Sequence, residues 1–312
     1  MIADNSVKTI QGLDLSSYTT LKIGREAETA YFPSNINEIL NIIDSLKKQN
    51  KKITVVGIGS NLLVSSQGVS GGVILTQNLK NYEISETGRV KVDCGIKSSK
   101  LAQIALEHNL SGLEFLIGIP GSLGGAVTMN SSAHGQGIED TIESAEVLNI
   151  ETGEIVTLDK SQLNLGYRYS FVESNKHLIL NATFQLKEDD SKNISDKMEF
   201  HVNYRKQNHP PLASCPSAGS TFRNPAPGVF VGQLFEQLGA KNWVEGGARV
   251  SSIHCNFIVN TGNATSLDVS RLMYKMYNAV KDNYGYDLLA EIRFVGDATE
   301  EEEMIWKSFQ VH

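Results

Sequence analysis

Cysteine is scarce in this chain, and its spacing argues against two classes of protein. The 312 residues contain three cysteines, Cys94, Cys215 and Cys255, which lie far apart and form no Cys-x-x-Cys pair. An odd number of widely separated cysteines argues against a disulfide framework, and the missing pair argues against a zinc site. We therefore expect reduced thiols in a cytoplasmic protein that binds no metal.

Basic charge, long apolar runs and a nucleotide-binding P-loop are also lacking. The net charge of −7 at pH 7 argues against a nucleic-acid-binding protein, which would normally carry a basic face. No apolar run approaches the length of a membrane span, and residues 1–20 lack the basic and apolar regions of a signal peptide. No Gly-Lys-Ser or Gly-Lys-Thr occurs, which excludes a P-loop for ATP. A hydrophobic content of 40% instead describes an ordinary globular protein, long enough for two or three domains.

Glycine, by contrast, is concentrated in one stretch. Residues 116–126 place Gly118, Gly121, Gly124 and Gly125 within eight positions. Glycine allows a positive φ and a close approach of the backbone to a ligand, and successive amides without side chains can form a nest for a pyrophosphate. A tight buried turn between two strands is the alternative. A second glycine loop, in residues 55–64, favours the ligand-binding interpretation.

The spacing of apolar residues predicts a mixture of helices and strands. Ile36, Ile39 and Ile43 repeat at helical spacing behind a possible Asn35 cap. The first glycine loop lies between two expected strands rather than between a strand and a helix, which argues against a classical dinucleotide-binding fold. The expected helices cover residues 36–46, 97–110, 229–238 and 265–284, and the expected strands and hairpin cover 53–56, 62–64, 73–76, 90–95, 145–158, 178–186 and 288–295.

Five motifs together resemble one enzyme family. They occur in order at residues 57–63, 112–126, 167–170, 217–225 and 289–293. The first two resemble FAD domains of the vanillyl-alcohol-oxidase type. The last three resemble, more specifically, the UDP-N-acetylenolpyruvoylglucosamine reductases, the MurB family of peptidoglycan synthesis. The resemblance extends from about residue 20 to residue 296.

Three features depart from the family pattern. Ile58 stands where the family usually has a glycine, and residues 130–134 are Asn-Ser-Ser-Ala-His rather than the commoner Asn-Ala-Gly-Ala-Tyr. The residues after Gly296 lie outside the pattern. The short connection after Arg168 is similar to the family type that lacks a substrate-covering insertion.

The resemblance implies an α+β fold with two domains: an FAD-binding domain of the vanillyl-alcohol-oxidase (PCMH) type and a smaller α+β substrate-binding domain. A polar stretch at residues 187–197 marks the boundary between them. The acidic run at residues 300–303 is expected as a solvated helix start. The expected divisions are an N-terminal arm at 1–20, the FAD-binding domain at 21–190, the substrate-binding domain at 195–298 and a tail at 299–312.

The resemblance also implies an activity. It predicts an NADPH-dependent flavoenzyme that reduces UDP-N-acetylglucosamine enolpyruvate to UDP-N-acetylmuramate. NADPH would reduce non-covalently bound FAD, leave, and be replaced by the sugar nucleotide; a monomer is expected. The expected contacts with FAD come from Gly57, Gly59, Ser60, Asn61, Leu62, Ile119, Pro120, Gly121, Ser122, Gly124, Gly125, Ala126 and Asn130.

The reaction needs a proton donor and a means of stabilising charge. Hydride addition to the methylene carbon leaves an enolate-like charge, and the carbon bearing the carboxylate then takes a proton. The resemblance makes Ser220 the proton donor, although a turn serine that bonds its own backbone is the alternative. It assigns Arg168 to the enolate charge, although an arginine beside Tyr167 could serve only a cation–π contact.

Glu291 completes the catalytic set that the resemblance implies. Glu291 and Arg293 would face one side of the expected strand at 288–295, near the substrate carboxylate. An exposed salt-bridged pair on an edge strand is the alternative. For His254, a hydrogen-bonded core histidine is equally compatible with the sequence. The expected substrate-binding residues are Arg205, Arg223, Asn224, His254 and Arg293.

Two other functions are compatible with the motifs. One is an oxidase of the same FAD fold that acts on a hydroxy acid or a sugar. The other is a catalytically silent module that binds flavin or a sugar nucleotide. A silent module would be expected to lack Arg168, Ser220 or Glu291, and all three are present.

Overall fold

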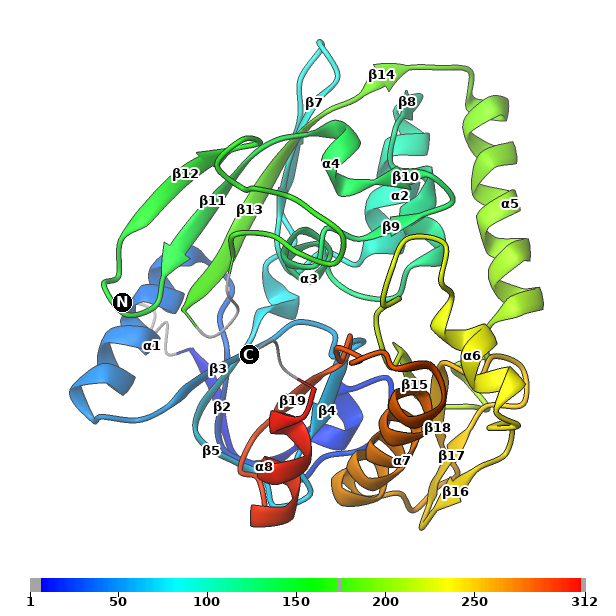
Figure 1. Cartoon of the computed structure of the whole chain (residues 1–312). Helices are drawn as coiled ribbons and strands as arrows, with labels where there is room; N and C mark the ends of the chain where they lie inside the picture. Colours follow the sequence, from blue (N-terminus) through cyan, green and yellow to red (C-terminus); the bar gives the residue numbers. More distant parts are fainter. Residues whose placement is uncertain (1–6, 173–175, 310–312) are drawn as a thin grey trace. The chain divides into compact units, whose positions relative to one another are not determined.

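The computed structural model describes residues 7–172 and 176–309 (Figure 1). Both helices and strands are abundant, as an α+β fold requires. The chain forms two compact units and passes between them several times; the domain limits expected from the sequence stay predictions. Unit 1 contains Met1–Gln11, Thr29–Ile58 and Gly71–Arg205, and unit 2 contains Gly12–Glu28, Gly59–Ser70 and Lys206–His312.

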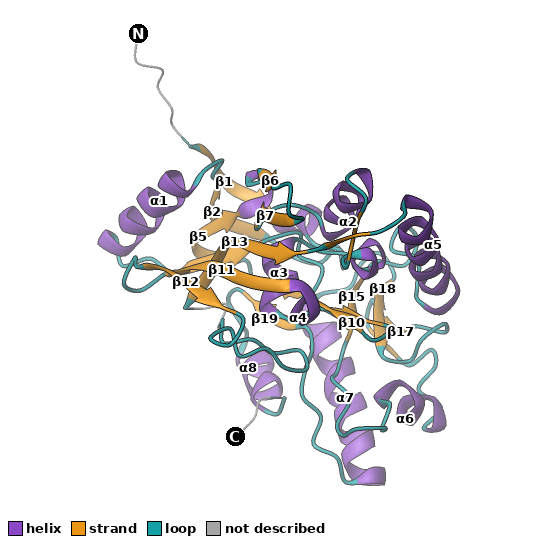
Figure 2. Ribbon diagram, turned by 90° about the horizontal axis from the view of Figure 1, so that it is seen from above, coloured by secondary structure: helices purple, strands orange, loops and turns teal. Residues whose placement is uncertain are grey.

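An antiparallel five-stranded sheet forms the centre of unit 1 (Figure 2). Its β11–β12 hairpin confirms the expected hairpin at residues 145–158. Helix α3 (Leu123–Thr128) packs on β13 and β7, and its Val127 joins the apolar cluster that contains Ala182 and Phe184. The strand order is β12 (Ile155–Asp159), β11 (Ile142–Asn149), β13 (His177–Gln185), β7 (Arg89–Asp93) and β6 (Tyr82–Ile84).

A four-stranded sheet has the order β1 (Lys8–Asp14), β2 (Glu26–Phe32), β5 (Val69–Leu75) and β3 (Ile53–Val56). The predicted cap of α1 (Ile36–Lys48) is confirmed, because the Asn35 side chain accepts the Glu38 N–H at 3.0 Å. Residues 76–208 also contain α2 (Ser98–Glu107), α4 (Ile138–Thr141), α5 (Ser191–Asn208), β8 (Leu110–Ser111), β9 (Ser132–Ala133), β10 (Gln136–Gly137), β14 (Lys187–Glu188) and two 3-10 helices (Thr76–Asn78 and Glu114–Gly118).

Unit 2 contains a second antiparallel sheet, of order β15 (Ser217–Ser220), β18 (Phe257–Asn260), β17 (Ala248–Val250) and β16 (Val244–Glu245). A parallel pair joins β4 (Leu62–Val64) to β19 (Arg293–Val295). Helix α7 (Ser266–Tyr284) begins at the predicted Thr265–Asp268 capping box and ends at Gly285, and its Met273 and Met276 are fully buried. Unit 2 also contains α6 (Val231–Gln237), α8 (Glu300–Lys307) and a 3-10 helix at Leu15–Tyr18.

Helix α5 is a feature that the sequence failed to predict. Residues 191–197, part of the polar stretch expected as a boundary, lie in its first turns. Ile194, Met198 and His201 are the buried residues of this fully described helix. The apolar stripe that identifies an amphipathic helix is therefore too sparse to recognise. The acidic run does begin a helix, α8, as expected, but its Glu302 is fully buried rather than solvated.

The expected strand at residues 288–295 is shorter than predicted, because the chain bends before Arg293. Ahead of the bend, the Glu291 N–H donates to the carbonyl of Thr221 at 2.8 Å. Beyond it, the Arg293 N–H donates to the carbonyl of Asn61 at 3.0 Å. The backbone thus changes its hydrogen-bonding partner between Glu291 and Arg293, so the two residues do not share one strand.

Among the described residues, no helix is both long and apolar enough to cross a membrane.

Candidate active site

The two glycine loops touch each other through Gly57 and Ser122, which both belong to unit 1. Gly57, just after β3, lies so close to Ser122 that an added Cβ would overlap the Ser122 Oγ. Ser122 forms a β-bridge with Lys97, and the carbonyl of Gly121 accepts the Ser98 N–H at 3.0 Å. The absence of a side chain at Gly57 therefore allows the two loops to meet beside the start of α3.

The second loop is not the open nest of amides that the sequence suggested. Gly124 and Gly125 lie in the first turn of α3. The N–H groups of Leu123 and Gly124 donate to the carbonyls of Ile96 and Cys94, both at 2.9 Å. These two amides anchor the helix to residues 94–96, so they are not available to a pyrophosphate.

The two glycines of α3 have different surroundings, and the difference tests whether a cofactor fits. A Cβ added at Gly124 would lie 3.0 Å from the Cβ of Cys94, closer than an ordinary contact. A Cβ added at Gly125 would meet nothing nearer than the Ser122 Oγ at 3.9 Å. Gly124 therefore allows α3 to pack, and Gly125 leaves open space that a ligand can approach. The residues of this loop fit a bound FAD.

Four other expected flavin residues belong to unit 2: Gly59, Ser60, Asn61 and Leu62. Gly59 has a φ of 65°, and an added Cβ there would overlap the carbonyl of Tyr18. The side-chain amide of Asn61 donates to the backbone carbonyl of Glu291 at 3.0 Å. The backbone carbonyl of Asn61 accepts the Arg293 N–H. Asn61 thus holds the segment that carries Glu291, a role that the motif did not reveal.

Arg168 stands in a tight turn of unit 1. Gly166 and Tyr169 exchange two backbone hydrogen bonds of 3.0 and 3.1 Å, and Arg168 between them has a φ of 54°. Its guanidinium lies 5.3 Å from the ring centroid of Tyr167 and donates to the Ser132 Oγ at 3.2 Å. The guanidinium therefore makes both a cation–π contact with Tyr167 and a hydrogen bond to Ser132. A left-handed backbone at a non-glycine residue costs about 1–3 kcal/mol, and such strain concentrates at functional sites.

Asn130, which we expected to contact FAD, connects the end of α3 to the Arg168 turn. Its side-chain amide donates to the carbonyl of Gly166 at 3.0 Å and to Glu139 at 3.1 Å. Its side-chain oxygen accepts the Glu139 N–H at 3.2 Å. Asn130 is 3% exposed, and its side-chain polar atoms bind other residues of the protein.

Arg205 belongs to a different unit from the other expected substrate residues. It lies in α5, and its guanidinium donates to the carbonyl of Gly118 at 3.1 Å, so it anchors the second glycine loop within unit 1. Burial lowers the pKa of this guanidinium. The other expected substrate residues belong to unit 2: Arg223, Asn224, His254 and Arg293.

Ser220 ends β15 at a β-bulge. The register with β18 shifts between Ser217 and Ser220, and Gly219 has a φ of 83°. A bulge turns a side chain away from the regular alternation of a strand. Over residues 7–172 and 176–309, the half-buried Ser220 hydroxyl makes no hydrogen bond. The turn-serine alternative, in which this hydroxyl bonds its own backbone, is therefore wrong.

A buried asparagine that the sequence analysis missed fixes the segment after Ser220. The side-chain oxygen of Asn256 accepts the Phe222 N–H at 3.0 Å, and its amide donates to the Phe222 carbonyl at 2.8 Å. The carbonyl of Asn256 accepts the Thr221 N–H at 2.8 Å. Nothing in the local sequence distinguishes Asn256 from an ordinary loop residue, because its partners lie far away along the chain.

The segments that carry Ser220 and Glu291 are paired through their backbones. Phe222 forms an antiparallel bridge with Ala290, and the Glu291 N–H donates to the carbonyl of Thr221. Unit 2 thus brings together the expected proton donor segment and the expected acidic residue, although they are distant in sequence.

Two arginines concentrate positive charge in the same unit. Burial lowers the pKa of the Arg293 guanidinium, and the charge of Arg223 lowers it further. The Nε of Arg223 is buried and has no hydrogen-bond partner within the described part of the chain. Like charges disfavour each other, and an anion near them relieves this cost and supplies hydrogen-bond acceptors. The pair therefore favours an anionic ligand such as a carboxylate or a diphosphate.

Asn224 and His254 lie at α6. The side-chain oxygen of Asn224 accepts the Val231 N–H at 3.1 Å, at the start of the helix. The Nδ1 of His254 accepts the Asn256 N–H at 3.2 Å, and the ring stacks on His209 with 5.7 Å between centroids. Burial lowers the pKa of His254, so the neutral ring carries its proton on Nε2. His254 is thus a hydrogen-bonded, partly buried histidine that can still donate through Nε2.

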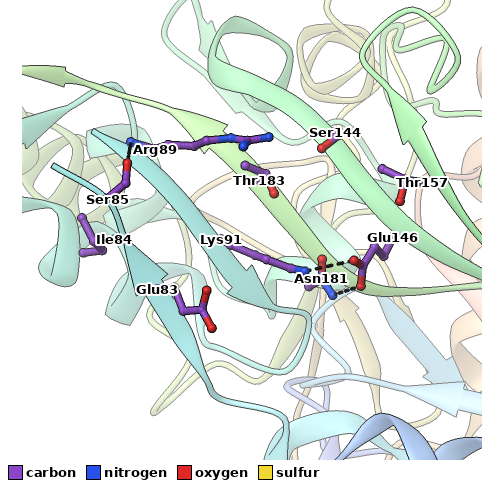
Figure 3. Close-up of a pocket in the computed structure, with 10 residues that line it drawn as sticks. All are labelled: Glu83, Ile84, Ser85, Arg89, Lys91, Ser144, Glu146, Thr157, Asn181 and Thr183. Carbon is purple, nitrogen blue, oxygen red and sulfur yellow. Dashed lines mark hydrogen bonds and ion pairs between the residues drawn. The ribbon is translucent and has the colours of Figure 1, made fainter. Parts of the chain in front are cut away.

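A polar hollow of about 410 Å³ lies on one face of the five-stranded sheet (Figure 3). Lys91 pairs there with Glu146 at 2.9 Å, and Asn181 donates to the same carboxylate. None of the described residues that line the hollow is an expected site residue. Because its main charged groups already bind each other, we assign it no ligand.

Two family models match the chain. Residues 27–159 match an FAD binding domain, and residues 210–295 match the C-terminal domain of UDP-N-acetylenolpyruvoylglucosamine reductase. The fold class expected from the sequence, an FAD-binding domain with a reductase-type substrate-binding domain, is confirmed.

Individual relatives agree with these matches. The UDP-N-acetylenolpyruvoylglucosamine reductase of Caldanaerobacter subterraneus subsp. tengcongensis is 38% identical over 91% of this chain and 92% of its own length. That of Bacillus subtilis is 38% identical over 93% of this chain and 94% of its own length. The crystal structure of the Thermus caldophilus reductase (MurB) covers 93% of this chain and 99% of its own, with a TM-score of 0.78 and 31% identity. The chain belongs to the UDP-N-acetylenolpyruvoylglucosamine reductase family.

Proposed function

We propose that this protein is an NADPH-dependent FAD enzyme that reduces UDP-N-acetylglucosamine enolpyruvate to UDP-N-acetylmuramate in peptidoglycan synthesis. Family membership supports the reaction and the cofactor. The structural observation that carries the proposal is the cluster in unit 2, where the paired segments of Ser220 and Glu291 accompany Arg223 and Arg293.

The roles follow from what the reaction requires. FAD, when bound, supplies the hydride that adds to the methylene carbon of the enolpyruvyl group. We assign to Ser220 the proton that the carboxylate-bearing carbon then takes, and the serine regains a proton from solvent. We assign to Arg223 and Arg293 the binding of the substrate carboxylate or diphosphate. Arg168 is assigned to stabilising the negative charge that develops as hydride adds, and Glu291 would assist it in its protonated form, as a hydrogen-bond donor.

The remaining assignments are proposals of the same kind. Gly57 and residues 119–126 would hold FAD, with Gly125 giving the backbone its open side. Asn224 and His254 would assist in binding the nucleotide. Arg205, which donates to the carbonyl of Gly118 in the second glycine loop, would also bind the substrate. We further propose NADPH as the hydride donor, a monomer as the active species and the cytoplasm as the compartment.

An anaerobic spectroscopic experiment tests the function. The purified protein should be yellow, and acid precipitation should release its FAD into the supernatant. NADPH should bleach the flavin absorbance, and the enolpyruvyl nucleotide should restore it without oxygen. An oxidase would instead be bleached by its substrate and restored by oxygen, and a silent module would not be restored by the nucleotide. Either result, or a yellow pellet after acid treatment, would count against the proposal.

A further inference from the structure

The chain continues beyond the matched reductase domain into a helix that packs on α7 in unit 2. The family match ends at residue 295, whereas the described structure continues through α8 to Phe309. Figure 1 draws α8 next to α7, and the two helices are in contact. We call residues 297–309 the tail segment. The proposed reaction gives this segment no role.

Three polar contacts fix the tail segment on α7, and one of them is the exposed ion pair of Arg271 with Glu301 at 2.7 Å. Glu302 is fully buried, and its carboxylate accepts the Ser266 Oγ–H at 2.6 Å. The indole Nε1 of Trp306 donates to the Ser270 Oγ at 2.9 Å. A buried carboxylate is costly unless it is hydrogen-bonded, so these contacts specify where α8 sits.

Phe309, at the end of the tail segment, reaches the paired segments of the candidate site. Its ring is 3% exposed and meets the ring of Phe222 edge to face, with 5.4 Å between centroids. Its carbonyl accepts the Ala290 N–H at 3.4 Å. Phe222 and Ala290 form the bridge that joins the Ser220 segment to the Glu291 segment, and Phe309 contacts both sides of that bridge.

We propose that Phe309 is a positioning residue for the reductase reaction, which holds the bridge between these two segments in register. The inference rests on the proposed function, because it concerns the step assigned to Ser220 and Glu291. Rates depend steeply on the placement of reacting groups, and a shift of about 1 Å caused from a distance can cost about 10²-fold. Loss of the Phe309 ring should therefore slow the reduction of the nucleotide while leaving the reaction with NADPH intact.

The test compares both half-reactions in FAD-loaded, full-length Phe309→Ala. Flavin reduction by NADPH should stay within about twofold of the wild-type rate, and reoxidation by the enolpyruvyl nucleotide should slow about tenfold or more. The matched control is Met304→Ala, since Met304 lies in α8 of the same tail segment and is 65% exposed. This control should react like the wild type in both steps.

Phe309→Leu keeps an apolar side chain but loses the edge of the ring, so we expect an intermediate slowing of reoxidation alone. This variant decides the question if Phe309→Ala accumulates too little folded enzyme. Wild-type reoxidation in both variants, or equal slowing of both half-reactions, would overturn the proposal. Failure of the nucleotide to reoxidise the wild-type protein would instead contradict the proposed function, so the two failures are distinguishable.

Discussion

At the scale of single residues, asparagine side chains place the segments that carry the candidate catalytic groups. Asn61 holds the Glu291 carbonyl, and Asn256 binds the N–H and the C=O of Phe222, just beyond Ser220. One asparagine can donate and accept at once, so it substitutes for a missing strand partner. Leaving such a buried backbone group unpaired costs about 1–3 kcal/mol. The positions of the reactive side chains therefore depend on asparagine side chains that bind backbone groups.

The first prediction concerns Ser220 itself. Ser220→Ala removes a hydroxyl that makes no hydrogen bond within residues 7–172 and 176–309, so folding and FAD binding should survive. Flavin reduction by NADPH should stay near the wild-type rate. Reoxidation by the enolpyruvyl nucleotide should fall by about 10²–10⁴-fold, the usual effect of losing a positioned acid. Stopped-flow measurements of the two half-reactions separate these effects.

Two further variants sharpen this test. Ser220→Cys should recover part of the loss, because a thiol can also deliver a proton. Ser214→Ala changes an exposed serine ahead of β15 and should leave both half-reactions unchanged. Equal slowing of both steps in Ser220→Ala would indicate a structural role, and unchanged reoxidation would remove Ser220 from the mechanism.

At the scale of elements, helix α3 contains two adjacent glycines with different surroundings. Gly124 packs against Cys94, and Gly125 faces open space. The second prediction is that Gly124→Val lowers the thermal midpoint of the apo-protein, because its side chain would be forced against Cys94 and overpacking costs about 1–3 kcal/mol. Gly125→Val should keep a midpoint near that of the wild type but purify with little FAD. Flavin content and apo-protein melting, measured on the same preparations, give both quantities.

The two glycine variants can each fail independently. A Gly125→Val protein that retained a full complement of FAD would show that the cofactor does not approach α3 at this position. A Gly124→Val protein as stable as the wild type would show that the Cys94 contact can relax without cost.

Elements with a strong local signal could be predicted from the sequence. The regular spacing and capping residues of α1 and α7 gave their positions, and the hairpin β11–β12 followed from its turn. Helix α5 was missed because few of its residues are apolar, and β19 was predicted too long because a bend is set by distant partners. Local pattern determines an element only where tertiary contacts do not override it.

The candidate site was predictable in its residue types but not in its supporting contacts. Ser220, Arg168 and Glu291 were selected because their motifs resemble those of the family. Their catalytic roles stay predictions. Asn256 and the bridge between Phe222 and Ala290 could not be foreseen, because backbone pairing between distant segments leaves no trace in local sequence.

At the scale of the whole molecule, the chain distributes its candidate residues over both units. Gly57, the second glycine loop, Arg168 and Arg205 belong to unit 1. Residues 59–62 of the first glycine loop, Ser220 and Glu291 belong to unit 2. Unit 2 also includes Gly12–Glu28 and Gly59–Ser70, so a single cut of the sequence does not separate the two units. A fragment made by one cut near residue 205 would therefore lack part of unit 2.

Stability of the whole protein should depend on pH through buried histidines in both units. Burial lowers the pKa of His201 in unit 1, with a further lowering from His134 and an opposing effect of Glu114. Burial likewise lowers the pKa of His254 in unit 2. The unfolded chain, with histidine pKa values of about 6.5, then binds protons more readily than the folded chain. The stability contribution of these neutral rings is therefore fully present above about pH 6.5 and is lost as the pH falls below it.

The third prediction uses His201 to test whether buried histidines cause the pH dependence of stability. His201→Leu removes a titrating ring whose buried Nδ1 has no hydrogen-bond partner among the described residues, so an apolar side chain should be tolerated there. The wild-type thermal midpoint should drop between about pH 7.5 and about pH 5.5, and the drop should be smaller in His201→Leu because one proton-binding difference is gone. Melting curves of both proteins, recorded with excess FAD at each pH, give the two drops. A drop of the same size in both proteins would mean that His201 does not couple protonation to unfolding.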